Sequence, residues 1–123
     1  MSLLKRGVRM SKGNGYAFSG TKGDIVNLIQ NLPPRPDKKF LEDWNDITHP
    51  KARENSSNIK YEHKETGLRV RFDPATPGAS GFNGKDHWHV YNPNKTGKKD
   101  EYLDENGNPT RDGSNPSHIL PKN

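Results

Sequence analysis

The chain contains no cysteine among its 123 residues. This excludes a disulfide framework and any metal site built on thiolates. The chain also lacks a run of about 18 apolar residues, so the sequence predicts no membrane-spanning helix. The Leu3-Leu4 pair is too short for the apolar centre of a signal peptide. Any export of this domain is therefore expected to depend on sequence outside it.

Hydrophobic residues are also scarce, at 27% of the chain, and the mean hydropathy is -1.19. A small core and long loops are expected from this composition. Short apolar runs with clear periodicity still distinguish the chain from disordered sequences, which bury too little apolar surface to fold. The length is that of a single domain.

Positive charge is concentrated at the start of the chain. The 20 Lys and Arg residues exceed the 15 Asp and Glu residues by five. Residues 1–22 contain five bases and no acid, which leaves 15 of each sign in residues 23–123. We therefore expect a basic leader or linker over 1–22 and one domain over 23–123. A basic arm favours polyanions such as nucleic acid, although a solvated leader without function accounts for it equally well.

Helical signals occupy the first half of the chain. Ile25, Leu28 and Ile29 lie on one face of a predicted helix over residues 25–31, and Asp24 is a suitable N-cap for it. A second helical turn is predicted over residues 37–44. A turn follows at His49-Pro50, because the residue before a proline is disfavoured in a helix.

From residue 58 onward the hydrophobic period is two, which is typical of strands. The predicted strands are residues 58–64, 68–72, 86–93, 101–104 and 116–121, the last as an edge strand. Residues 73–84 hold two prolines and three glycines and are expected to form a long loop. The sequence predicts an α+β fold, with N-terminal helices packed on one face of a twisted antiparallel sheet of four to five strands.

The alternation also assigns side chains to the two faces of the sheet. In residues 86–93, Trp88 and Val90 are expected to face the core. His87, His89 and Tyr91 then share the opposite face, which we expect to be open to solvent. In the same way Leu68, Val70 and Phe72 point inward, while Arg69 and Arg71 point outward.

The residues expected on the open face suit RNA cleavage by attack of a ribose 2′-hydroxyl on the adjacent phosphate. Histidine serves as acid or base near neutral pH, and arginine holds phosphate with its planar fork. Tyr91 can stack on a base or donate a proton, and the flanking Lys85 can reach a phosphate. The expected last strand brings Ser117 and His118 beside the histidine strand. No metal ion or other cofactor is required by this chemistry.

Other interpretations of the same residues stay open. A His-x-His pair on a strand is also typical of a structural pair or of two ligands of a metal ion. The two arginines can be a solvated strand face. His49, in a turn, and His63, on the core side, are not expected in the site.

Four segments resemble a known family: TGLRVRFDP at 66–74, DHWHVYNP at 86–93, YLDENGNP at 102–109 and SHI at 117–119. Together they resemble the C-terminal nuclease domains of bacterial polymorphic and contact-dependent growth inhibition toxins, in the barnase/EndoU/colicin/RelE-like group. The resemblance implies a metal-independent ribonuclease whose site lies on the concave face of the sheet. By residue type and strand position, the catalytic roles would fall to His87, His89, Arg69, Arg71, Ser117 and His118.

The resemblance also implies a biological setting. The substrate would be tRNA or another RNA, and a cognate immunity protein would bind the domain tightly. The domain would be exported as the tip of a larger secreted or surface effector and would act in the cytoplasm of the target bacterium.

Two rival functions remain at this point. A metal-dependent DNase of the His-Asn-His kind would use Asp86-His87, an asparagine such as Asn106, and His118 as a ligand. Such a site normally needs a helix after a hairpin, and glycines and prolines between residues 104 and 118 argue against one. The other rival is a non-catalytic RNA-binding module, which the basic arm and an Arg/Tyr-bearing sheet would serve equally well.

Overall fold

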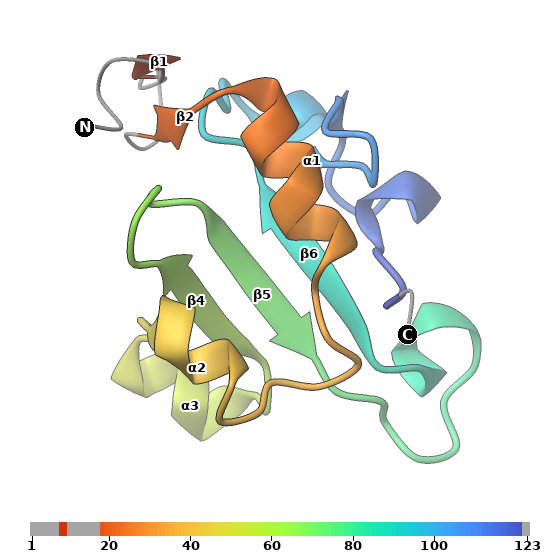
Figure 1. Cartoon of the computed structure of the whole chain (residues 1–123). Helices are drawn as coiled ribbons and strands as arrows, with labels where there is room; N and C mark the ends of the chain where they lie inside the picture. Colours follow the sequence, from red (N-terminus) through yellow and green to blue (C-terminus); the bar gives the residue numbers. More distant parts are fainter. Residues whose placement is uncertain (1–7, 10–17, 122–123) are drawn as a thin grey trace.

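The histidine strand lies inside a six-stranded antiparallel sheet. This arrangement is seen in a computed structural model of the protein, which describes residues 8–9 and 18–121. The strands of the sheet lie in the order β3-β4-β5-β6-β7-β8, and Figure 1 shows β4, β5 and β6 side by side. They are β3 (Trp44–Asp46), β4 (Ile59–His63), β5 (Arg69–Asp73), β6 (His87–Tyr91), β7 (Tyr102–Leu103) and β8 (Pro109–Thr110). A separate pair is formed by β1 (Val8–Arg9) and β2 (Ser19–Gly20).

The described residues contain three α-helices and three short 3-10 helices. The α-helices are α1 (Lys22–Gln30), α2 (Phe40–Asp43) and α3 (Pro50–Asn55). The 3-10 helices are η2 (Gly81–Gly84), η3 (Lys98–Asp100) and η4 (Asn115–Ser117). The predicted α+β class with an antiparallel sheet is confirmed. None of the helices in the described segments is long and apolar enough to cross a lipid bilayer.

The number of strands differs from the predicted four to five. Strand β3 was not predicted. Its first residue, Trp44, was expected at the end of the second helical turn, which the structure keeps only over α2. Strand β8, which pairs with β7, was not predicted. Residues 116–121 do not form the expected edge strand, because η4 occupies their start and only Ile119 bridges to Trp88.

Helix α1 begins earlier than predicted. The N-cap is Thr21, and Asp24 is the third helical residue of a capping box. The Asp24 amide donates to the Thr21 hydroxyl at 3.1 Å, and the Thr21 amide donates to the Asp24 carboxylate at 2.8 Å. Ile25 and Ile29 of this helix are buried. Of the predicted basic leader 1–22, only residues 8–9 and 18–22 are described, and among these Phe18 is fully buried.

The core lies between the sheet and the helices α1 and α2, which cover the same face (Figure 1). The alternation is confirmed here, because Leu68, Val70, Trp88 and Val90 all have no exposed surface. Phe40 of α2 packs against Trp88 with 5.1 Å between the ring centroids. Helix α3 contributes no buried residue, so the expected packing of helices on one face holds for α1 and α2 only.

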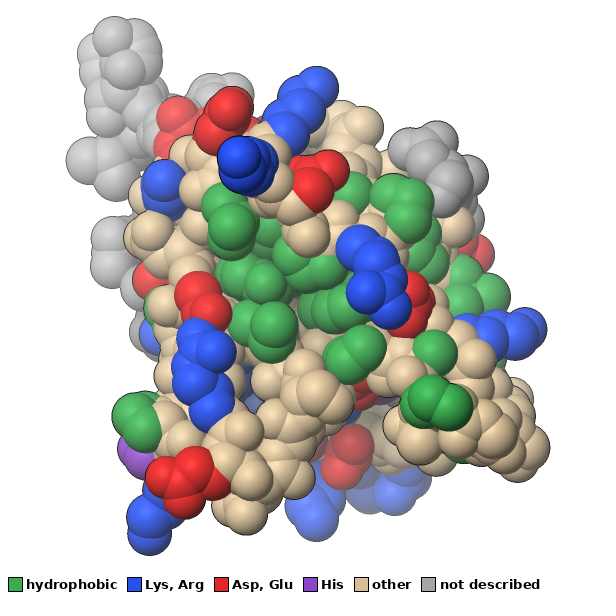
Figure 2. Space-filling model, turned by 90° about the horizontal axis from the view of Figure 1, so that it is seen from below, with side chains coloured by type: hydrophobic (Ala, Val, Ile, Leu, Met, Phe, Trp, Pro, Cys, Tyr) green, Lys and Arg blue, Asp and Glu red, His purple; other side chains and the backbone are tan. Residues whose placement is uncertain are grey.

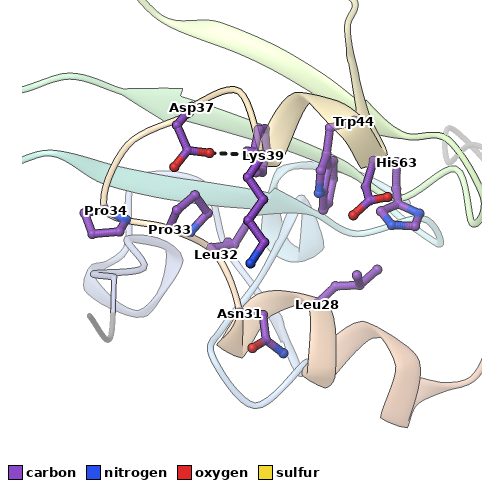
Figure 3. A pocket seen from close by; sticks show the side chains of 11 residues that line it. Leu28, Asn31, Leu32, Pro33, Pro34, Asp37, Lys39, Trp44 and His63 are labelled. Carbon is purple, nitrogen blue, oxygen red and sulfur yellow. Dashed lines mark hydrogen bonds between the residues drawn. The ribbon is translucent and has the colours of Figure 1, made fainter.

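A cleft opens on the helical side of the sheet. Seen from below the view of Figure 1, apolar side chains gather near the centre of the molecule's face, with charged side chains around them (Figure 2). A cleft of about 370 Å³ is lined by Leu28, Leu32, Phe40, Trp44 and His63, among others (Figure 3). Its lining comes from α1, α2 and the linker between them, together with strands β3 and β4. The cleft therefore belongs to the helical face, while His87 and His89 point to the opposite one.

Candidate active site

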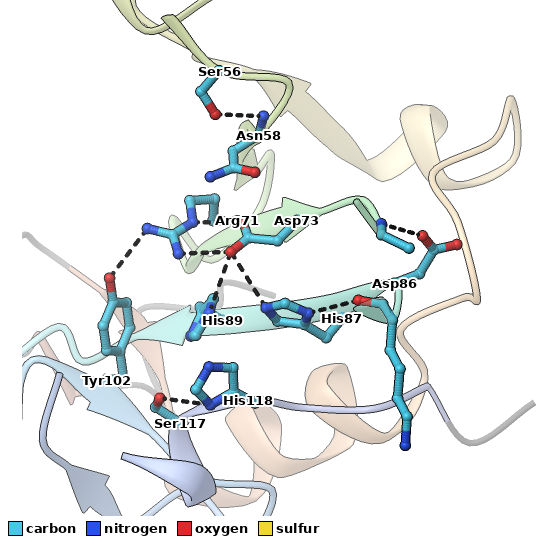
Figure 4. A network of polar contacts seen from close by, with 12 residues as sticks. Ser56, Asn58, Arg71, Asp73, Asp86, His87, His89, Tyr102, Ser117 and His118 are labelled. Carbon is cyan, nitrogen blue, oxygen red and sulfur yellow. Dashed lines mark hydrogen bonds and ion pairs between the residues drawn. The ribbon is translucent and has the colours of Figure 1, made fainter. Parts of the chain in front are cut away.

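The register of β5 and β6 sets two charged residues opposite the two histidines. Arg71 pairs with His89, and Asp73 pairs with His87. Because side chains alternate along a strand, all four lie on the face opposite the core. Figure 4 shows Arg71, Asp73, His87 and His89 pointing toward one another.

Asp73 is the centre of this network. Its carboxylate accepts two hydrogen bonds from Arg71, from Nε at 2.7 Å and from Nη2 at 2.8 Å. The Oδ2 atom also lies 3.4 Å from Nε2 of His87 and 3.4 Å from Nε2 of His89. Burial alone would raise the pKa of Asp73, but the contacts from His87, His89 and Arg71 hold it far below its ordinary value. Asp73 is therefore a firmly ionised carboxylate.

Arg71 is held in the same way. Burial opposes its charge, but the hydrogen bonds and the charge of Asp73 prevail and raise the pKa of Arg71 above its ordinary value. Its Nη1 donates to the hydroxyl of Tyr102 at 3.3 Å. Burial also raises the pKa of Tyr102, so its hydroxyl stays protonated. The guanidinium thus has a fixed direction on the sheet face.

His87 is almost completely buried, with 2% of its surface exposed. Its Nδ1 lies 2.8 Å from the carbonyl oxygen of Lys85. Because a carbonyl only accepts, Nδ1 carries the hydrogen, and Nε2 faces Asp73. Burial lowers the pKa of His87, but the contacts with Asp73 and with the Lys85 carbonyl raise it more, and the net shift is upward.

His89 has the opposite balance. It is 4% exposed, and burial lowers its pKa more than Asp73 raises it, with the charge of Arg71 adding to the decrease. Its Nε2 faces Asp73, while its Nδ1 is buried and has no hydrogen-bond partner among the described residues. Buried polar atoms are normally paired, so this nitrogen stands out as one available to a ligand or to a proton.

The third imidazole comes from the end of the chain. The bridge between Ile119 and Trp88 sets this segment along β6, so that the ring centroid of His118 lies 4.7 Å from that of His89 and 5.0 Å from that of His87. The Nδ1 atom of His118 lies 2.8 Å from the carbonyl oxygen of Ser114. The ring of Phe82 stacks on that of His118, with 4.3 Å between the ring centroids. The predicted meeting of His118 with the histidine strand is confirmed.

This arrangement corrects one expectation. The sheet face with the histidines was predicted to be open to solvent, and it is largely covered instead. His118, Phe82 and Tyr102 surround the two strand histidines, with Tyr102 4.9 Å from His89 between ring centroids. Of the three imidazoles only His118 keeps appreciable exposed surface.

The other predicted site residues lie at different distances from this cluster. Ser117 is fully buried, and its hydroxyl donates to the Ser114 carbonyl at 2.7 Å. Arg69 forms an ion pair with Glu62 at 3.0 Å, on the neighbouring strand β4. Tyr91 packs on Tyr102 with 5.2 Å between ring centroids. Lys85 is exposed and contacts His87 through its backbone carbonyl.

Sequence reasoning missed three residues of the cluster, namely Asp73, Tyr102 and Phe82. A signal existed for Asp73, because the alternation of β5 continues one residue past Phe72. Tyr102 lies in a strand that was predicted, without a role. Nothing in the sequence indicated that Phe82, from the loop, would stack on His118.

Two further observations bear on metal chemistry. One ring nitrogen from each of His87, His89 and His118 lies within 4.8 Å of the others, so these residues could hold a metal ion. Beside His118 lies a cavity of about 560 Å³, whose lining includes Asn106. The helix that a His-Asn-His site needs is not present, because residues 104–118 form β8, η4 and turns.

No family model matches the chain, and neither the search of curated proteins nor that of solved structures found a match.

Proposed function

We propose that the chain is an endoribonuclease that cleaves RNA by transesterification without a metal ion. The observation that carries this proposal is the cluster on one sheet face, where three imidazoles adjoin the Arg71–Asp73 pair. Proton transfer and phosphate binding are the two needs of this reaction. Imidazole and guanidinium groups supply them.

The reaction forms one bond and breaks another. The ribose 2′-oxygen attacks the adjacent phosphorus, and the bond from phosphorus to the 5′-oxygen breaks. One imidazole takes the proton of the 2′-hydroxyl, and a protonated imidazole gives a proton to the departing 5′-oxygen. The products are a 2′,3′-cyclic phosphate and a 5′-hydroxyl. Arg71 would stabilise the charge on the phosphorane oxygens.

His118 is the imidazole best placed to meet the substrate. It retains more exposed surface than His87 and His89. Because its Nδ1 is engaged by the Ser114 carbonyl, its Nε2 is the nitrogen available to RNA. His87 and His89 are buried and contact Asp73. They would exchange protons with the substrate together with His118 or through it.

Cations around Arg71 support a polyanionic substrate. Lys60, on β4, pairs in register with Arg71. Burial lowers the pKa of Lys60, and the nearby charges of Arg69, Arg71 and Lys95 lower it further. Arg69, Arg71 and Lys95 are each paired with a carboxylate, from Glu62, Asp73 and Glu101. A phosphate group would therefore bind in exchange for these carboxylates or at Lys60.

The biological setting in this proposal rests on the resemblance of four segments to toxin domains. It is that of a bacterial toxin carried at the tip of an exported effector, acting on tRNA or another RNA in the cytoplasm of the target cell. A cognate immunity protein would then neutralise it. A basic active-site face would favour an acidic partner.

The test is incubation of the purified chain with total bacterial RNA in EDTA. His118→Ala is the variant, and His49→Ala is the matched control, because His49 is exposed at the start of α3. We expect the parent chain and His49→Ala to release fragments with 2′,3′-cyclic phosphate ends, and His118→Ala to leave the RNA intact. Cleavage only after addition of a divalent metal would contradict the mechanism. RNA binding without any cleavage would favour a binding module.

A further inference from the structure

We propose that His87, His89 and His118 form a binding site for a divalent transition-metal ion of the zinc class, and that a bound ion blocks RNA cleavage. The binding site is argued from geometry alone. Its effect on cleavage rests on the proposed function.

The donor atoms are already gathered. One ring nitrogen from each histidine lies within 4.8 Å of the other two. Zinc holds imidazole nitrogen at about 2.0 Å in tetrahedral geometry, which sets neighbouring ligands about 3.3 Å apart. Small rotations of the rings would close this difference. Imidazole ligands select zinc, copper, nickel or cobalt over magnesium and calcium, which prefer oxygen.

Two of the rings are oriented as metal-binding histidines usually are. The Nδ1 atoms of His87 and His118 each lie 2.8 Å from a backbone carbonyl, that of Lys85 and that of Ser114. Each of these nitrogens must donate, which leaves Nε2 of the neutral ring with a lone pair. A hydrogen bond from the second nitrogen to a carbonyl is the usual means of orienting such a ligand.

His89 provides an independent observation. Its Nδ1 is buried without a partner in the described segments, in a side chain that is 4% exposed. Its Nε2 faces the Asp73 carboxylate at 3.4 Å. When Nε2 donates to Asp73, the lone pair of His89 is at Nδ1. A ring rotation that turns Nδ1 toward His87 and His118 would let it coordinate the ion, which would satisfy an atom that is otherwise left unpaired.

The charges nearby act in both directions. Asp73 is ionised, and its Oδ2 lies 3.4 Å from Nε2 of His87, within reach of a fourth ligand position. Arg71 opposes a second cation, but its guanidinium is held on the Asp73 carboxylate. An ion among the three rings would take the lone pairs that cleavage needs for the 2′-hydroxyl proton. Metal binding and catalysis would therefore exclude each other.

Metal binding is measured on the full chain after treatment with a chelator. Zn²⁺ is titrated by calorimetry, and Co²⁺ by its visible absorption, which is intense only in tetrahedral sites. We expect one ion per chain for the parent and for His49→Ala, and at least about tenfold weaker binding for His118→Ala. His118→Asn is added so that a loss can be separated from unfolding, with circular dichroism on each sample. Equal affinity in the parent and both His118 variants, or no binding in the parent, would overturn the site.

Cleavage is then assayed on the same samples with and without Zn²⁺. Inhibition of RNA cleavage by the parent chain, at the Zn²⁺ concentration that fills the site, would support the proposal that metal binding and catalysis exclude each other. Cleavage that continues with the site filled, or that requires Zn²⁺, would overturn it. If RNA stays intact under every condition, the proposed function fails, whereas the binding measurements still decide the metal site.

Discussion

Asp73 and His87 face each other across strands β5 and β6, with Oδ2 of the carboxylate 3.4 Å from Nε2 of the imidazole. The same oxygen lies 3.4 Å from Nε2 of His89 and accepts a hydrogen bond from Arg71 at 2.8 Å. One carboxylate thus positions two imidazoles and a guanidinium, although it is itself not expected to touch the substrate.

The first prediction concerns this carboxylate. Asp73→Asn keeps the size of the side chain but removes its charge. Arg71, which is mostly buried, would lose its ion pair, and the two rings would lose their common partner. We expect a loss of about 2 to 4 kcal/mol in the free energy of unfolding, measured by urea denaturation. We also expect kcat for RNA cleavage to fall by at least about tenfold.

Asp86→Asn is the matched control, because Asp86 lies next to the histidine strand but pairs with the exposed Arg35. An ion pair with an exposed arginine contributes little to stability, and the amide oxygen of asparagine can still accept the Ala75 amide that Asp86 accepts at 2.7 Å. We therefore expect little change in unfolding or in kcat. If both variants behaved alike, Asp73 would not be the organising group.

The second prediction separates Ser117 from His118. The Ser117 hydroxyl is buried and donates to the Ser114 carbonyl at 2.7 Å, so it is committed to holding the η4 turn. Ser117→Ala is expected to cost about 1 kcal/mol in the free energy of unfolding. Cleavage of RNA should change little, in contrast to His118→Ala. Loss of cleavage in Ser117→Ala at unchanged stability would instead give the hydroxyl a catalytic role.

The faces of the central strands could be predicted because the signal is local. Trp88 and Val90 alternate with the histidines, and a period of two is visible in any single strand. The same reasoning ended β5 one residue too early, because Asp73 was assigned to the loop over residues 73–84 with its two prolines and three glycines. Asp73, the charged centre of the site, was therefore not predicted as a site residue.

Features that depend on distant residues could not be predicted. The burial of His87 and His89 depends on Ile119 bridging to Trp88 and on Phe82 stacking over His118. Strand β3 forms because Trp44, Asn45 and Asp46 pair with β4 through the backbone. Two polar residues and one tryptophan give no alternation from which such a strand could be recognised.

The third prediction concerns His63, far from the histidine cluster. Its Nδ1 accepts the amide hydrogens of Glu65 and Thr66, each at 3.2 Å, which a protonated ring nitrogen cannot do. Burial lowers the pKa of His63, against the opposing charges of Asp43 and Glu65. Below about pH 6.5, the ordinary pKa of histidine, the unfolded chain binds a proton that the folded chain does not. The contribution of His63 to stability is therefore present above that pH and lost as the pH falls.

His63→Asn should reduce this pH dependence, because asparagine accepts the same backbone hydrogens without titrating. The measurement is urea unfolding at pH 7.5 and pH 5.5, where we expect the variant to lose less stability than the parent. His49→Asn is the control, since His49 also accepts a backbone hydrogen, from Lys51, but is exposed. If both substitutions reduced the pH dependence of the free energy of unfolding equally, this dependence would not be due to His63.

The last prediction concerns Trp88, which lies between the two strand histidines but points to the core. It has no exposed surface, and its indole Nε1 donates to the carbonyl of Pro33 at 2.9 Å. That bond ties the linker between α1 and α2 to the sheet. Trp88→Phe would leave the carbonyl unpaired and a cavity beside Phe72, whose ring centroid lies 4.9 Å away. We expect a loss of about 2 to 4 kcal/mol in the free energy of unfolding.

Trp44→Phe provides the comparison for this substitution. Trp44 lies on the edge strand β3 and stacks on Phe40 at 5.1 Å, an arrangement that phenylalanine can keep. Its replacement should therefore cost less than that of Trp88. Because Trp88 is flanked in sequence by His87 and His89, its replacement should also loosen the histidine cluster, and near-ultraviolet circular dichroism together with the RNA assay would show this. If Trp44→Phe lowered the free energy of unfolding more than Trp88→Phe, the contact between α2 and β3 would hold the helices on the sheet more firmly than the hydrogen bond from Trp88 to Pro33.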